Sequence, residues 1–77
     1  MKPIGESLKW WRDVRGVSQW DLAHKSGVGY ASIARIETGR QDPTVGMLAR
    51  LAEALEIELV DFFIEPNQPA RKWARGK

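Results

Sequence analysis

Two side chains near the middle of the chain have the chemistry and the spacing to bind the edges of DNA bases. Ile33 and Ile36 lie three positions apart, which marks the inward face of a helix, and Tyr30, Ala31 and Arg35 fall on the opposite face. The guanidinium of an arginine can donate two hydrogen bonds to the acceptors of a guanine in the major groove. A tyrosine can offer its hydroxyl or lay its ring on the methyl group of a thymine. The pattern therefore indicates a helix that can read double-stranded DNA.

The sequence gives no support for an enzyme or for a metal site. The chain has no cysteine and a single histidine, His24, which we expect to be solvated. The sequence offers no paired nucleophile and base and no phosphate-binding loop. Four acidic residues lie close together in the sequence, Glu53, Glu56, Glu58 and Asp61. They lack the spacing of a calcium loop, and we interpret them as a solvated face directed away from DNA. We therefore expect no enzymatic activity, no metal and no cofactor.

The charge of this 77-residue chain is small but unevenly distributed. The net charge is +2. Basic side chains outnumber acidic ones in residues 1–40, and acidic ones predominate in residues 41–65. In residues 66–77 every charged side chain is basic. This distribution suggests that one face meets a polyanion, although ordinary surface scatter is the alternative. Because no apolar stretch resembles a signal peptide or a membrane span, we expect a cytoplasmic, nucleoid-associated protein without membrane contact.

Apolar residues at helical spacing predict the helices that position the reading segment. The first helix ends at Gly16, and the second begins after the N-cap Ser18 and ends at Gly27, so it is only about two turns long. The third, the reading helix, runs from about Gly29 to Glu37. The first helix has its inward residues at Ile4, Leu8, Trp11 and Val14.

Two further helices are predicted after the loop that follows the reading helix. Thr44 is the N-cap of the fourth helix, whose inward residues are Leu48, Leu51, Ala52 and Leu55. A short fifth helix is indicated by Ile57, Leu59, Phe62 and Phe63. The sequence thus predicts an all-α domain over residues 1–65 and a flexible basic tail over residues 66–77, which either tracks phosphates or only aids solubility.

An ordered series of short motifs resembles the Cro/phage-repressor helix-turn-helix family, also known as the xenobiotic-response-element type. The resemblance covers residues 4–63 and rests on the segments IGESL at 4–8, VSQ at 17–19, LA at 22–23, SGV at 26–28, SIARIE at 32–37, GR at 39–40, PT at 43–44 and DFF at 61–63, with the leucines and alanines of the fourth helix. It implies a five-helix, lambda-repressor-like fold with the helix-turn-helix at helices 2 and 3. It also implies a dimeric transcriptional repressor or regulator.

The resemblance assigns roles to particular residues of this chain. The base-reading positions of the family fall at Tyr30, Ala31 and Arg35. The positions expected to contact the DNA backbone are Gln19, Ser32, Thr38 and Arg40. Some members hold a salt bridge between helix 1 and the end of helix 3, and the matching pair is Arg12 and Glu37. Arg12 is accordingly interpreted as structural, with a direct phosphate contact as the alternative.

Three departures from the family pattern stand out. Trp20 replaces the usual glutamate, Tyr30-Ala31 replaces a polar pair, and Glu56 occupies the place of the glycine or asparagine that ends helix 4, where we expect local strain. Trp10 also does not fit the apolar face of its helix. Exposed Trp10, Trp20 and Trp73 would suit a protein partner, while packing over a helix end is the alternative.

Together these observations predict a sequence-specific, double-stranded DNA-binding transcriptional regulator, a homodimeric repressor with a palindromic operator. The dimer is expected to form through the surplus apolar residues Leu59, Phe62, Phe63 and Ile64. The alternative is an antitoxin-type module that binds a protein and binds DNA only secondarily. A fold retained without DNA affinity is a third hypothesis, which Arg35 and Arg40 disfavour.

Overall fold

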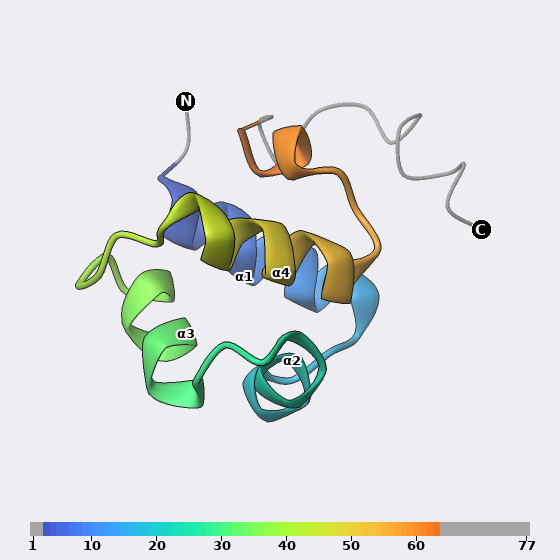
Figure 1. Ribbon diagram of the computed structural model, residues 1–77, viewed down its shortest axis with the longest axis horizontal. Helices are drawn as coiled ribbons and strands as arrows, with labels where there is room; N and C mark the ends of the chain where they lie inside the picture. The colour runs from blue at the N-terminus through green and yellow to red at the C-terminus, as the bar shows by residue number, and fades with distance from the viewer. Residues whose placement is uncertain (1–2, 64–77) are drawn as a thin grey trace.

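The protein folds into a small bundle of helices, described here by a computed structural model over residues 3–63 (Figure 1). The elements are α1 (Ile4–Arg15), α2 (Gln19–Ser26), α3 (Tyr30–Glu37), α4 (Val45–Leu55) and the 3-10 helix η1 (Leu59–Phe63). Residues 3–63 contain no strand, so the predicted all-α fold is confirmed. The expected fifth α-helix is instead a 3-10 helix, the tighter form that suits a segment of five residues. The predicted boundary at residue 65, Ile64 and the basic tail lie outside the described residues.

Capping residues mark the ends of α2 and the start of α4 where the sequence predicts. The hydroxyl of Ser18 accepts a hydrogen bond from the backbone N–H of Asp21 at the start of α2. The hydroxyl of Thr44 does the same for Met47 at the start of α4. Gly27 adopts the left-handed conformation, φ 77°, that allows the chain to leave α2 sharply. Each hydroxyl cap contributes about 1 kcal/mol to its helix.

All four α-helices and η1 contribute to a single apolar core. Its buried residues are Leu8, Trp11, Leu22, Val28, Ile33, Ile36, Leu48, Leu51, Ala52, Leu55 and Phe62. The indole N–H of Trp11 donates to the carbonyl of Asp61 at 3.3 Å, which fastens η1 to α1. Phe62 is fully buried, so its expected place in a dimer interface is wrong: this ring completes the core of its own domain.

Two further expectations about burial are wrong. Val14 is 45% exposed, because three steps of three or four residues rotate it off the face that Leu8 and Trp11 share. Arg15 takes the inward position instead. Asp61, expected on a solvated face, is 2% exposed and accepts a hydrogen bond from the N–H of Glu58 at 2.9 Å, which caps η1.

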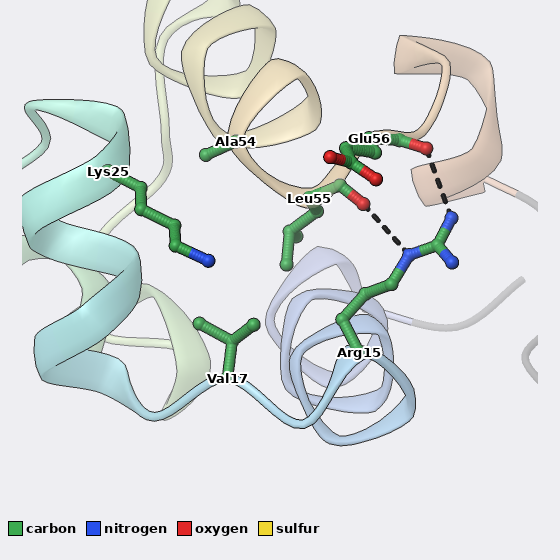
Figure 2. A pocket seen from close by; sticks show the side chains of 6 residues that line it. All are labelled: Arg15, Val17, Lys25, Ala54, Leu55 and Glu56. Atoms are coloured by element: carbon green, nitrogen blue, oxygen red, sulfur yellow. Dashed lines mark hydrogen bonds between the residues drawn. The ribbon is translucent and has the colours of Figure 1, made fainter.

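Arg15 stabilises the strained end of α4. Glu56 adopts φ 60°, the only positive φ at a non-glycine position among residues 3–63, which agrees with the expected strain. The guanidinium of Arg15 donates to the carbonyls of Leu55 (2.9 Å) and Glu56 (3.0 Å), as Figure 2 shows. Carbonyls at the end of a helix have no partner within the helix, so Arg15 supplies their hydrogen bonds. Its positive charge also interacts favourably with the negative end of the helix dipole.

Gly5 allows α1 and α3 to cross at very short range. A Cβ built on Gly5 would overlap the backbone carbonyl oxygen of Ile36 and lie 3.0 Å from that of Glu37. Because both neighbours are backbone atoms, no side chain can turn away to make room. The close crossing sets the position of the C-terminal end of α3 on α1.

Candidate nucleic-acid interface

The face of α3 opposite the core is exposed, as the spacing of its isoleucines predicts. Ile33 and Ile36 are fully buried, while Tyr30, Ala31 and Arg35 are exposed. Three residues join α2 to α3, and the two helices pack directly on each other at one side of the molecule (Figure 1). This is the geometry in which a second helix enters a major groove while the first crosses the DNA backbone.

A buried carboxylate ties the end of α3 to α1 and α2. Glu37 accepts hydrogen bonds from Nε of Arg12 at 2.7 Å and from its Nη2 at 3.1 Å. The side chains of Arg12 and Glu37 are 12% and 4% exposed, so water screens the pair weakly. The hydrogen bond with Glu37 is the main reason that the pKa of Arg12 lies above its usual value, against the opposing effect of burial. The arrangement is the helix 1 to helix 3 bridge that the family resemblance implies.

Gln19, expected at the DNA backbone, is part of the same network. Its amide nitrogen donates to Glu37 at 3.0 Å, and its side chain is partly buried. A carboxamide carries two N–H donors, so one remains for a phosphate. The bond to Glu37 therefore orients Gln19 at the start of α2 without exhausting its donors.

Arg35 is oriented by a loop residue that the sequence analysis missed. Its Nε donates to Oε1 of Gln41 at 2.9 Å, across the turn after α3. This contact leaves both Nη atoms, the pair that an arginine presents to a guanine end-on. A polar residue six positions after the arginine, beyond a glycine turn, was the available signal.

The remaining predicted backbone contacts differ in their availability. Arg40 is exposed and follows Gly39, whose φ of 80° turns the chain away from α3. The hydroxyl of Thr38 lies 3.1 Å from the carbonyl of Ala34 and 3.2 Å from that of Arg35, so its hydrogen is directed into the helix end. Ser32 is partly buried. Of these three, Arg40 offers the freest donor.

The tryptophans occupy different environments. Trp10 is half-buried and packs edge-on against Trp11, with ring centroids 5.0 Å apart, so it covers the core. Trp20 is 68% exposed and stacks flat on Tyr30, with centroids 4.2 Å apart and planes 9° from parallel. Sequence reasoning treated Trp20 and Tyr30 as separate departures from the family pattern, whereas they form a contact pair. Trp73 lies outside the described residues.

Neither a metal site nor a membrane helix is found in residues 3–63. No group of three histidine, cysteine or acidic side chains in that range is arranged to hold a metal ion. In the same range, no helix is long and apolar enough to cross a bilayer.

Comparisons with known proteins agree with this geometry. The Helix-turn-helix (HTH_3) family model matches residues 8–62. An HTH-type transcriptional regulator of Methanocaldococcus jannaschii is 35% identical over 57 residues, 74% of this chain and 86% of that protein. The HTH-type transcriptional repressor RghR of Bacillus subtilis is 41% identical over 58 residues, 74% of this chain but 43% of that protein. The restriction-modification controller protein C.AhdI from Aeromonas hydrophila superposes with a TM-score of 0.77 at 31% identity, covering 79% of this chain and 92% of that one. The chain therefore belongs to the HTH_3 helix-turn-helix family.

Proposed function

We propose that this protein is a sequence-specific regulator of transcription that reads the major groove of double-stranded DNA with α3. The observation that carries the proposal is the exposed face of α3, with Tyr30 and Arg35 opposite the fully buried Ile33 and Ile36. The family membership and the names of the relatives, regulators and a repressor, support it. Such a function places the protein with the DNA, in the cytoplasm.

In this proposal, base recognition and contact with the sugar-phosphate backbone are assigned to different side chains. Arg35 presents its Nη atoms to a guanine while Gln41 holds its Nε, and Tyr30 meets a neighbouring base at the entry of the helix. Arg40 lies beyond a glycine turn and reaches only the sugar-phosphate backbone. Gln19 adds a phosphate contact at the start of α2. Base preference then depends on α3, and much of the salt dependence on Arg40.

We further propose a homodimer that represses transcription from a palindromic operator. With Phe62 in the core, the exposed apolar residues of η1 are Leu59, Val60 and Phe63, which are 36%, 59% and 46% exposed. Figure 1 places η1 across α1 and α4 from α2 and α3, so pairing through η1 leaves the reading helix uncovered. A twofold pair with its α3 helices about 34 Å apart would meet two half-sites one DNA turn apart.

The antitoxin alternative rests on exposed Trp10, Trp20 and Trp73. Trp10 is half-buried, Trp20 belongs to the same surface as Tyr30, and Trp73 lies outside the described residues. A protein partner on Trp20 would therefore compete with DNA for one face. The geometry favours DNA as the primary partner.

In vitro selection from a random DNA library tests the proposal directly. We expect a consensus with two inverted half-sites, bound far more tightly than scrambled DNA at the same salt concentration. An asymmetric consensus would keep the DNA-binding function and overturn the homodimer. Recovery of no consensus, together with affinity that is equal for all sequences, would overturn the proposed function.

A further inference from the structure

The most unusual feature of the α2–α3 surface is the flat stack of Trp20 on Tyr30. Trp20 lies in the first turn of α2, and Tyr30 is the first residue of α3. Their ring centroids are 4.2 Å apart and their planes differ by 9°. Yet Trp20 remains 68% exposed. An indole so exposed contributes little to the core, so stability alone does not account for its place.

The stack completes a set of contacts that hold both ends of α3. At its C-terminal end, Glu37 is bound by Arg12 and Gln19. At its N-terminal end, Val28 packs into the core two residues before the helix begins, while the N-cap Gly29 offers no side-chain hydrogen bond. On Tyr30, the first residue of the helix, Trp20 supplies a further contact at this end. Both contacts to α2 come from neighbouring residues, Gln19 and Trp20.

The position of the tyrosine hydroxyl depends on this contact. The hydroxyl stands at the far end of a ring that turns about two side-chain bonds, so a small rotation moves it a long way. A partner stacked flat on one face confines the ring to one plane, while Tyr30 as a whole remains 36% exposed. A donor held in place loses less conformational entropy when it binds.

We propose that Trp20 is a specificity-determining positioning residue: it holds the Tyr30 ring so that its hydroxyl meets one base pair of each half-site. The inference rests on the proposed function, since it assigns α3 to the major groove. It requires no direct contact between Trp20 and DNA. The chemistry required at position 20 is a flat ring rather than an indole N–H.

Quantitative binding to the selected site and to its single-base variants tests this role. The variants are Trp20→Ala, Trp20→Phe, Tyr30→Ala and the double variant Trp20→Ala/Tyr30→Ala. Val45→Ala is the matched control, because Val45 is 71% exposed on α4 and its truncation removes apolar surface elsewhere. Thermal unfolding of each variant shows whether it is folded.

We expect Trp20→Ala and Tyr30→Ala to reduce discrimination about fivefold at the same base pair and nowhere else, the scale of one lost contact. The double variant should match Tyr30→Ala alone, because residues acting through each other are not additive. Trp20→Phe should restore the discrimination. Val45→Ala should leave it unchanged, and Trp20→Ala should unfold at nearly the temperature of Val45→Ala.

Other outcomes overturn the inference. Weakening by Trp20→Ala that is equal for all sequences, and equal in Trp20→Phe, would identify the indole N–H as a phosphate donor instead. Additive effects at different base pairs would make Trp20 independent of Tyr30. Ring-current shifts of the Tyr30 protons in DNA-free protein give a second test, because they should vanish in Trp20→Ala and persist in Trp20→Phe. A recovered consensus with unchanged discrimination in Trp20→Ala refutes only this inference, whereas no consensus at all refutes the proposed function with it.

Discussion

The carboxylate of Glu37 joins three helices, and its removal tests the framework that holds α3. Glu37→Ala takes the acceptor from both guanidinium contacts of Arg12 and from the amide of Gln19. The guanidinium, 12% exposed, would retain the carbonyl of Val17 at 3.0 Å and a longer contact to Asp13 at 3.9 Å. Breaking a buried pair from one side costs about 3–5 kcal/mol, and the retained contacts favour the lower end, about 3 kcal/mol.

That loss is large for a domain of this size. Small domains have a free energy of unfolding of about 5 kcal/mol or slightly more. One kcal/mol shifts the melting temperature of a 60–100-residue domain by about 4–8 °C, so Glu37→Ala should melt about 12–24 °C lower. Glu37→Gln keeps the shape but only one acceptor oxygen, and its NH2 group faces an N–H of Arg12, so we expect it to lose more than about half as much. The exposed Glu53→Ala should change the melting temperature little.

Circular dichroism melts of the three variants, with DNA titrations at a temperature where all are folded, measure the two consequences separately. We expect stability to fall much more than base preference. The sign of the pH dependence follows from the raised pKa of Arg12: its contribution is complete below the ordinary arginine pKa and is lost only as the pH rises through still higher values. The stability difference between wild type and Glu37→Ala should therefore lose nothing through Arg12 between about pH 7 and pH 10.

A melting temperature of Glu37→Ala within about 2 °C of wild type would refute this reasoning. The bridge would then offer no net stabilisation, and Arg12 would return to the candidates for phosphate contact. Equal losses in Glu37→Ala and Glu53→Ala would also refute it, since only one of the two carboxylates is buried.

Three further predictions concern packing, DNA contacts and assembly. Gly5→Ala should destabilise the fold by about 1–3 kcal/mol in urea unfolding, because the new methyl group overlaps the carbonyl of Ile36; a neutral result would show that α1 can shift on α3. In binding isotherms, Arg35→Ala should cost about 1–3 kcal/mol of binding free energy on the preferred site and relax the preference at one base pair per half-site. Arg40→Ala should weaken the affinity for all sequences alike and reduce the salt dependence of binding by roughly one phosphate per subunit, and exchanged effects would reverse the two assignments. Phe62→Ala should destabilise the fold by about 3–5 kcal/mol, whereas Phe63→Ala should weaken dimerisation in sedimentation equilibrium and leave the free energy of unfolding almost unchanged. A wild-type protein that stays monomeric at high micromolar concentration, with and without DNA, would contradict the dimer.

The predictable part of this fold is the part controlled by local chemistry. Ser18 and Thr44 each meet an N–H of the helix they begin, and Gly27 turns the chain after α2, because capping involves only residues close in sequence. The inward face of α3 was equally accessible, since two isoleucines three positions apart define it. The Arg12–Glu37 pair came from resemblance alone, because spacing along the chain carries no information about two charges 25 positions apart.

What sequence reasoning missed depends on rotation and on contacts between elements. A helical face drawn through Val14 ignores that a step of three residues falls short of the 3.6 residues of a full turn. Two such steps place Val14 to the side, and Arg15 points inward to the end of α4 instead. Phe62 and Phe63 are adjacent and chemically identical, yet one fills the core and the other is 46% exposed. Only the direction in which η1 meets α1 and α4 separates them.

The Trp20–Tyr30 stack shows most clearly how such contacts bear on function. Each residue departs from the family pattern, and each alone suggests a different consequence, a partner surface for one and an altered operator for the other. Their parallel rings, 4.2 Å apart, make the two departures one structural change on one surface. If the Tyr30 hydroxyl reads a base, the residue that confines its ring contributes to the choice of base without touching DNA. A relative that carries tyrosine on α3 but a small residue in place of Trp20 should then discriminate less at the same base pair.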